Sequence, residues 1–317
     1  MDSKISSLCL HWSGCSDRGK VRVNNEDSFV GLRFNRQELE RLGKDGEASL
    51  QTADFVFAVS DGMGGAQAGE FASRMAVEKV PQILPKGFRS ERGPSEGIAA
   101  GVLLQALFRE IHAALVYMGR SYEECRGMET TLSLCWFTPG LLHFAHVGDS
   151  RIYHLPASGG IRQLTEDDTY VGWLYRHGKI NEREARTHPR RNVLQKALGG
   201  GNQFVDPQIG AVPYAVGDQF LICSDGLVDG SIEEFIAFGS PQRRAQVGGV
   251  FLAQAHVERA GAGEADAVAA LAEIMGQGRD EAEAAARLLH LHVAGGSAGL
   301  VGDVFQRELV HQLRADN

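Results

Sequence analysis

Apolar and polar positions along the chain follow two kinds of pattern. Residues 55–59 form an unbroken apolar run, which is typical of a strand buried on both faces. Residues 69–80 carry apolar side chains at helical spacing, and Pro81 is expected to end that helix. Residues 98–118 are typical of a long amphipathic helix, and residues 181–184 have the form of a capping box. We therefore expect strands together with separate helices.

Three consecutive strands are predicted at residues 131–137, 141–147 and 151–155. Their connections, residues 138–140 and 148–150, are short and contain glycine. Strands joined by turns this short pair antiparallel, because a parallel pair needs a long crossover. Antiparallel strands with separate long helices predict an α+β layered domain.

Four acidic motifs follow in order along the chain, and three of them come directly after strand-like runs. They are Glu26 and Asp27 with Arg22 before them, Asp61 with Gly62, Gly148 with Asp149, and Asp225 with Gly226. Any single Asp-Gly pair is first of all a turn dipeptide. Four such motifs together indicate hard oxygen ligands gathered around a divalent metal ion.

These motifs resemble those of the metal-dependent protein phosphatases of the type 2C serine/threonine family, in its bacterial form. Matching segments run in order at residues 16–27, 61–70, 128–131, 147–153, 164–168, 188–199 and 223–229. The resemblance covers about residues 9–230, which we expect to be the catalytic domain. It implies two antiparallel sheets stacked face to face and flanked by helices, an αββα sandwich, with the metal site at one end.

The resemblance also implies the chemistry. Phosphoserine and phosphothreonine in proteins would be hydrolysed by a water activated by two Mn²⁺ or Mg²⁺ ions. Asp61 would bridge both ions, the backbone carbonyl of Gly62 would be a further ligand, and Asp225 would ligate one ion. Glu26 and Asp27 would orient metal-bound waters. Asp61, Asp225 and Glu26 are therefore the expected catalytic residues.

Arg22 and Asp149 keep alternative interpretations. Arg22 would grip the substrate phosphate in a bidentate way, or form a surface ion pair with Glu26. Asp149 would join Asp225 at a third ion, or cap the turn between two strands. Thr130 and Thr131 begin a strand, and we interpret both as structural.

Position 63 departs from part of the family. Some relatives have histidine directly after the Asp-Gly pair, where it can protonate the leaving alcohol; Met63 cannot, so no general acid is assigned. His143 and His146 alternate faces of one strand, so we do not expect them to bind one metal together. His188 precedes proline, and we interpret it as a loop-anchoring residue.

The composition changes after Gly230. Residues 231–317 are rich in alanine and glycine, with helical spacing at 264–275, 280–292 and 301–315. We expect a mainly helical, diverged or truncated segment. The family's closing Asp-Asn ligand motif, which runs into a strand, is missing. Asp316 is a weak candidate for that ligand, and Asp303 has no asparagine after it.

The composition of the chain limits the classes of partner that it can bind. A net charge of −8 argues against nucleic acid as the main partner, and no apolar run approaches the roughly 20 residues of a membrane span. The five scattered cysteines indicate reduced thiols in a cytoplasmic protein. By family analogy the partners are phosphorylated proteins, including a bacterial serine/threonine kinase and its targets.

Two other functions remain open. The missing closing motif would suit a catalytically impaired relative that acts as a phosphoprotein-binding regulatory module. A two-metal nuclease is the third hypothesis. The acidic composition and the lack of a recognisable basic or aromatic patch in the sequence argue against it.

Overall fold

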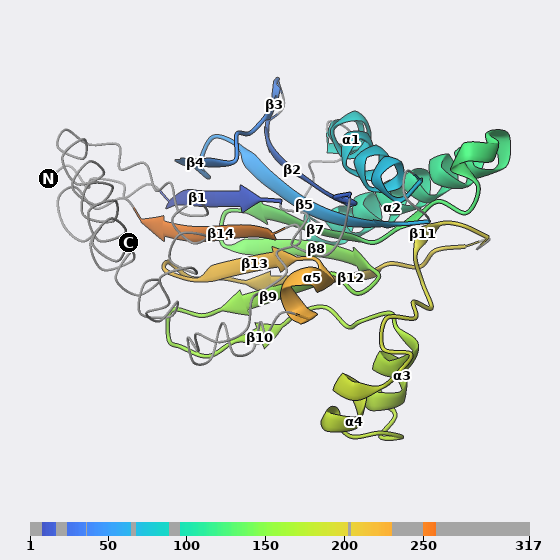
Figure 1. Ribbon diagram of the computed structural model, residues 1–317. Helices are drawn as coiled ribbons and strands as arrows, with labels where there is room; N and C mark the ends of the chain where they lie inside the picture. The colour runs from blue at the N-terminus through green and yellow to red at the C-terminus, as the bar shows by residue number, and fades with distance from the viewer. Residues whose placement is uncertain are drawn as a thin grey trace, which may run out of the picture.

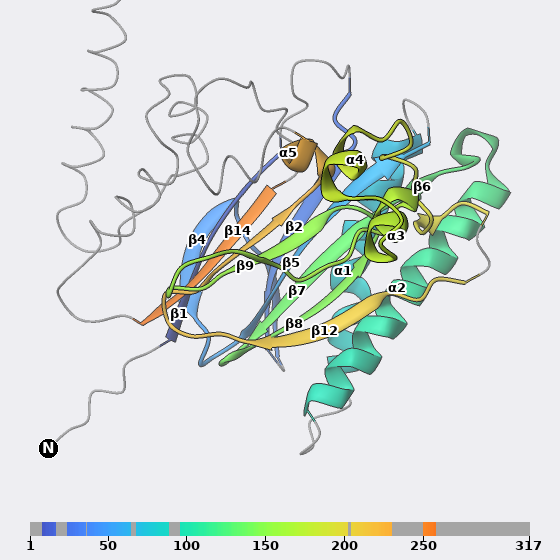
Figure 2. The same cartoon turned by 90° about the horizontal axis from the view of Figure 1, so that it is seen from below.

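A computed structural model of the chain describes residues 8–16, 24–35, 37–64, 68–88, 96–201, 204–229 and 250–257. These residues form two antiparallel sheets and a small number of helices. Figure 1 and Figure 2 show the two sheets stacked on each other, with two long helices lying along one side.

The first sheet has six strands. In spatial order they are β10 (Arg162–Gln163), β9 (Arg151–Leu155), β13 (Gln219–Cys223), β14 (Val250–Val257), β1 (Leu8–Cys15) and β4 (Asp45–Ser49). Each strand pairs antiparallel with its neighbours. Strands from the start, middle and later part of the chain therefore share one sheet.

The second sheet has eight strands. Along its main path they are β11 (Leu198–Gly199), β6 (Glu129–Thr130), β5 (Asp54–Met63), β7 (Leu132–Thr138), β8 (Leu141–Val147) and β12 (Gln208–Pro213). A side branch adds β2 (Asp27–Phe34) against β5 and β3 (Leu39–Arg41) against β2. The expected strands at 141–147 and 151–155 are confirmed as β8 and β9. The antiparallel pairing expected between them is wrong, because β8 pairs with β7 and β12 here, whereas β9 pairs with β10 and β13 in the six-stranded sheet.

The helices are of two kinds. Long helices α1 (Ala68–Phe88) and α2 (Glu96–Ser121) lie over the eight-stranded sheet, and a 3₁₀ turn spans Glu123–Cys125. The short helices are α3 (Tyr170–Arg176), α4 (Glu182–Thr187) and α5 (Asp225–Asp229). In Figure 1, α3 and α4 project away from the sheets. The capping box at Asn181 and Glu184 is confirmed as the start of α4.

Three apolar clusters define the layers. The first joins α1 and α2 to the eight-stranded sheet and includes Val56 and Ala58. The second fills the space between the sheets and includes Phe55 and Phe57. The third lies on the outer face of the six-stranded sheet, where Leu227 of α5 packs. This arrangement confirms the expected αββα sandwich.

Strand β5 is buried on both faces because it lies inside this layered structure. Its even-numbered residues Val56 and Ala58 face the helices, whereas Phe55, Phe57 and Val59 face the other sheet. Side chains alternate along a strand, so Asp61 continues the row that faces the other sheet. The strand continues to Met63, which places Asp61 inside β5 rather than after its end.

Helix α1 is longer than the sequence pattern predicts. It passes through Pro81 and ends at Phe88, so the expected end at Pro81 is wrong. A proline inside a helix costs about 3 kcal/mol. Val80 and Leu84 are buried in the cluster between helices and sheet, and their burial helps to offset that cost.

Strand β14 corrects the expectation for the C-terminal segment. Residues 231–317 were expected to be mainly helical, but Val250–Val257 forms a strand between β13 and β1. Hydrogen-bonding partners on both edges outweigh the weak strand propensity of its alanines. The three segments expected to be helical, and Asp303 and Asp316, lie outside the described residues.

Helix α2 contains a segment that has to be compared with the expectation of no membrane-spanning run. Residues Ala100–Ser121 are long and apolar enough to cross a membrane by length and composition alone. Leu104, Leu107, Phe108 and Ile111, however, belong to the cluster that packs this helix on the sheet. Its apolar stripe is therefore used within the protein core, as in an amphipathic core helix.

The cluster between the sheets should carry much of the stability. We expect Phe57→Ala to lower the free energy of unfolding by about 3–5 kcal/mol, because it removes a fully buried ring and leaves a cavity. The Phe57 ring contacts Phe137 edge-on, with 5.8 Å between centroids. Urea unfolding measures the effect, with Tyr117→Ala on the exposed face of α2 as the control. A loss below about 1 kcal/mol for Phe57→Ala would contradict this layering.

Candidate metal centre

Strand register places two aspartates face to face. Asp27 of β2 is the direct cross-strand partner of Asp61 in β5. The amide of Gly62 donates to the carbonyl oxygen of Glu26 at 3.0 Å, which fixes the same register one residue further on. Like charges directly opposite on neighbouring strands destabilise a sheet, so this pair requires a compensating interaction.

Two more carboxylates reach this point, one from the other sheet and one from the turn that joins the two sheets. Asp225 follows β13 and begins α5, and its carboxyl group lies within hydrogen-bonding reach of that of Asp61. Asp149 lies in the turn between β8 and β9 and interacts electrostatically with both Asp61 and Asp225. Ser224 donates its hydroxyl to Asp27 Oδ2 at 3.2 Å and so ties β13 to β2.

Burial and mutual repulsion perturb these groups strongly. Asp61 is only 5 % exposed, and its burial raises the pKa well above the usual range; Asp27 and Asp225 raise it further. Burial, followed by repulsion from Asp225 and Asp167, raises the pKa of Asp149 to about 8. A nearby cation would favour the charged forms and reverse both shifts.

These residues fit a hard divalent cation. The donors are carboxylate oxygens, which suit Mg²⁺ and Mn²⁺. Among the described residues, no group of three or more His, Cys, Asp or Glu side chains is arranged so that it could hold a metal ion. An ion bound here would therefore need water or other ligands besides these carboxylates.

Glycines allow the backbone to come close around Asp61. A Cβ atom at Gly62 would overlap the carbonyl group of Gly69, near the start of α1. A Cβ at Gly69 would lie 2.8 Å from Glu26 Oε1. The sequence interpretation gave Gly62 the role of a carbonyl ligand; the contacts show in addition that glycine is needed for α1 to pack here.

Hydroxyl groups hold the backbone of Asp61 on its other side. Thr130 Oγ1 donates to the Asp61 carbonyl at 2.8 Å, and Thr131 Oγ1 accepts from the Asp61 amide at 3.0 Å. Thr131 Oγ1 also lies 2.7 Å from the hydroxyl oxygen of Ser150. The interpretation of both threonines as structural is therefore correct, and what they position is the central aspartate.

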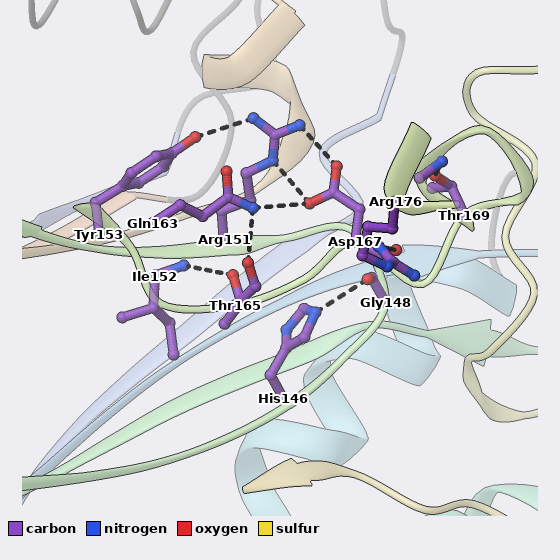
Figure 3. Close-up of polar contacts among 11 residues, drawn as sticks. His146, Gly148, Arg151, Ile152, Tyr153, Gln163, Thr165, Asp167, Thr169 and Arg176 are labelled. Carbon is purple, nitrogen blue, oxygen red and sulfur yellow. Dashed lines mark hydrogen bonds and ion pairs between the residues drawn. The ribbon is translucent and has the colours of Figure 1, made fainter. Parts of the chain in front are cut away.

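A half-buried ion pair supports the turn that carries Asp149. Arg151 donates from Nε and Nη2 to the two carboxylate oxygens of Asp167, at 2.8 and 2.6 Å, and from Nη1 to Tyr153 (Figure 3). The fork of the guanidinium is thereby used by Asp167. The alternative in which Asp149 caps the turn has two forms, binding Arg151 or binding backbone. Arg151 lowers the pKa of Asp149 only electrostatically, whereas a hydrogen bond from the backbone of Asp149 to its own carboxyl group also lowers it, as in a turn cap.

Asp168 fixes the same turn from a second direction. Its Oδ2 accepts from the amide of Gly148 at 3.2 Å, and its own amide donates to the Gly148 carbonyl at 2.7 Å. Lys196 Nζ lies 3.2 Å from Asp168 Oδ1. The segment 164–168 therefore holds the residue before Asp149 in place.

Neither of the two histidines of β8 joins the carboxylate cluster. His146 is fully buried, with Nδ1 2.8 Å from the Ser133 hydroxyl and Nε2 3.0 Å from the Gly148 carbonyl (Figure 3). Burial lowers its pKa, so the neutral ring is favoured. His143 lies against the Trp136 ring instead, which confirms that the two histidines do not form a metal pair. His188 accepts the Arg190 amide at 3.1 Å, as expected for a loop anchor.

Met63 has an acidic neighbour that the sequence analysis did not consider. Glu129 is its cross-strand partner, and burial raises the pKa of this carboxyl. The carboxylate lies against Gly200, on the β11 side of β6 and away from β5. The geometry therefore does not make Glu129 a general acid in place of Met63.

The structure brings together most of the residues expected from the sequence: Glu26, Asp27, Asp61, Gly62, Asp149 and Asp225. Arg22 and Asp316 lie outside the described residues. The sequence analysis missed the supporting roles of Ser224 and Asp167, because a hydroxyl or a paired carboxylate next to a motif carries no signal of its own.

Comparison with known proteins agrees with this geometry. The profile of the protein phosphatase 2C family matches residues 46–275, which is more than half of the chain. The chain belongs to the protein phosphatase 2C family. The match extends past residue 230 and includes β14, as the sheet order requires.

Relatives of this phosphatase 2C family member carry matching names. The serine/threonine protein phosphatase PstP of Mycobacterium tuberculosis is 33 % identical over 231 residues, which are 73 % of this chain and 38 % of that protein. The serine/threonine phosphatase stp of Listeria innocua is 34 % identical over 221 residues, 69 % of this chain and 79 % of that protein. The chain thus spans well under half the length of PstP.

A solved structure shows the same fold. The catalytic domain of PstP in complex with two manganese ions is 29 % identical, with a TM-score of 0.59. The alignment covers 80 % of this chain and all of that domain. The stacked sheets of this family member therefore have a direct structural counterpart.

The raised pKa of Asp149 predicts how stability depends on pH without metal. Its value rises from 3.8 to about 8 on folding, so the folded protein holds more protons than the unfolded chain between these values. The free energy of unfolding of EDTA-treated protein should fall by more than about 1 kcal/mol as pH rises from about 5 to 8. Urea unfolding at several pH values measures this.

Asp149→Asn should flatten that dependence, and saturating Mn²⁺ should oppose it by compensating the charged forms. Asp206→Asn, at an exposed aspartate, is the matched control and should leave the pH dependence unchanged. Equal pH dependence in wild type and Asp149→Asn would show that Asp149 is ionised in the metal-free fold.

Proposed function

We propose that this protein hydrolyses phosphoserine and phosphothreonine in proteins, in a metal-dependent way. The observation that carries the proposal is the meeting of Asp27, Asp61, Asp149 and Asp225 at one end of the sandwich, with the pKa values of Asp61 and Asp149 raised by burial and mutual repulsion. The repulsion between these carboxylates favours the binding of divalent cations, which would compensate their negative charge. Family membership and the names of the relatives support the reaction class.

The residues would hold two ions of Mn²⁺ or Mg²⁺. When bound, such ions lower the pKa of water and neutralise charge on a transferring phosphoryl group. The presence of two manganese ions in the PstP structure supports this stoichiometry. Asp61 lies between Asp27 and Asp225 and is best placed to be shared between two ions.

Each remaining residue then has a positional role. Asp225 would hold one ion from the six-stranded sheet. Glu26 and Asp27 would accept hydrogen bonds from water and so orient it. Thr130 and Thr131 keep the Asp61 backbone from shifting as charge changes in the site. A third ion at Asp149 and Asp225 is part of the proposal and rests on their electrostatic coupling.

Some expectations stay predictions. Asp316 as a closing ligand is one, since it lies outside the described residues. The cytoplasmic location, the kinase partner and the absence of membrane association are others. The boundary of the catalytic domain at residue 230 is proposed only in an amended form, with β14 included in the domain.

Removing the central carboxylate should abolish turnover. We expect Asp61→Asn to lower Mn²⁺-dependent hydrolysis of p-nitrophenyl phosphate and of a phosphothreonine peptide by more than tenfold, and excess EDTA to inactivate the wild type. Asp206→Asn should keep wild-type rates. A tenfold loss of rate corresponds to a rise of about 1.4 kcal/mol in the activation free energy. If Asp61→Asn keeps more than about a tenth of the wild-type rate, the two-metal proposal is wrong.

Arg22 is proposed to bind the substrate phosphate, on the strength of its place in the first acidic motif. Arg22→Ala should raise KM and weaken inhibition by inorganic phosphate, because a bidentate grip is lost, while Mn²⁺ affinity stays unchanged. Steady-state kinetics and a Mn²⁺ titration measure the two effects. Phosphate inhibition equal to that of the wild type would assign Arg22 to the surface.

A further inference from the structure

Positive charge is concentrated in one part of this acidic protein. Residues 169–196, which we call the basic excursion, hold seven Lys or Arg side chains and two Glu, whereas the whole chain has a formal charge of −8. The basic excursion contains α3 and α4 and projects from the sheets (Figure 1). The sequence analysis found no basic patch, because these charges are spread over 28 positions with no continuous run.

The cations of the basic excursion lie at the surface. Ion pairs join Arg176 to Glu166 at 3.2 Å, Arg186 to Glu182 at 2.7 Å, and Lys196 to Asp168. Exposed ion pairs of this kind contribute little and exchange readily. Within the part of the chain that the structure describes, Lys179 and Arg183 have exposed side chains without an ion pair.

Aromatic side chains lie among these cations. Trp173 is 39 % exposed and Tyr175 is 50 % exposed, both in α3. The Trp173 ring stacks on His177 with 4.3 Å between centroids, and Arg190 lies 4.4 Å over the Tyr170 ring. Exposed aromatic rings beside cations give a surface both contact area and charge, which is the composition of interfaces rather than of a purely solvated face.

Both ends of the basic excursion are fastened beside the proposed metal centre. Thr169 bridges to Leu194, and the amide of Tyr170 donates to the Val193 carbonyl at 2.9 Å, so the excursion closes on itself. The preceding residue, Asp168, is bonded to Gly148, next to Asp149. A molecule bound on the excursion is therefore held close to the site where phosphate would react.

We propose that the basic excursion docks an acidic segment of the phosphoprotein substrate, close in sequence to its phosphorylated residue. This inference rests on the proposed phosphatase function and specifies its substrate class. Charge complementarity selects an acidic peptide, and the aromatic rings supply contact with its side chains. A long polyanion such as nucleic acid is disfavoured, because the rest of the protein is strongly acidic.

The experiment compares three phosphothreonine peptides with acidic, neutral or basic flanks, using the full chain with Mn²⁺. Wild type should show the highest kcat/KM for the acidic peptide, with a preference that fades as salt rises. The variant Lys179→Glu/Arg183→Glu should raise KM for the acidic peptide by about threefold to tenfold and leave the basic peptide unchanged or improved. Its rate with p-nitrophenyl phosphate should not change.

The control variant carries the same number of charge reversals elsewhere. Arg41→Glu/Lys44→Glu alters two exposed residues at and beside β3, remote from α3 and α4 in Figure 1, and should keep the wild-type peptide preference. Arg183 lies in the first turn of α4, where glutamate favours the helix, so the test variant should fold. Thermal unfolding checks this for both variants.

The outcomes separate two kinds of failure. If wild type hydrolyses p-nitrophenyl phosphate and all three peptides equally, the docking proposal is overturned while the phosphatase proposal stands. If wild type hydrolyses none of them with Mn²⁺, the phosphatase proposal itself fails. Equal losses in the test and control variants would show a general charge effect and also overturn docking, as would stronger competition by single-stranded DNA than by an acidic peptide.

Discussion

Repulsion between closely placed carboxylates, of which Asp61 is buried and the others half-buried, is the constraint on which the rest of this structure depends. Asp27 and Asp61 are held opposite each other by strand register, and Asp149 and Asp225 approach them from other strand ends. The fold thus concentrates like charge where water is largely excluded. Such an arrangement is costly without a cation and favourable with one, so cation binding and stability are coupled.

The surrounding contacts oppose that repulsion by fixing the backbone instead of neutralising the charge. Thr130 and Thr131 bind the carbonyl and amide of Asp61, and the Arg151–Asp167 pair and Asp168 hold the turn before Asp149. Closely packed backbone around Gly62 leaves no room for a side chain. The carboxylates are therefore preorganised, which limits the rearrangement that ion binding requires.

Charge is distributed over the molecule in two separate regions. The acidic cluster, with Asp61 buried at its centre, lies at the end of the sandwich, and the basic excursion projects from the sheets at the surface, joined through Asp168. One region selects cations and the other suits anionic protein segments. The exposed cations do not neutralise the carboxylates, because solvent and salt screen the attraction of charges at the surface. Charges that are shielded from solvent are screened much less.

Local sequence determined the elements whose limits depend on near neighbours: the strands β8 and β9, the capping box of α4, and the order of the acidic motifs. Only the tertiary structure decided that β8 and β9 lie in different sheets, that β14 is a strand, that α1 continues through Pro81, and that Asp27 faces Asp61. Turns and caps form through hydrogen bonds between residues that are close in the chain, so the local sequence can specify them. Register and strand insertion depend on partners far away in the chain, whose burial outweighs local preference.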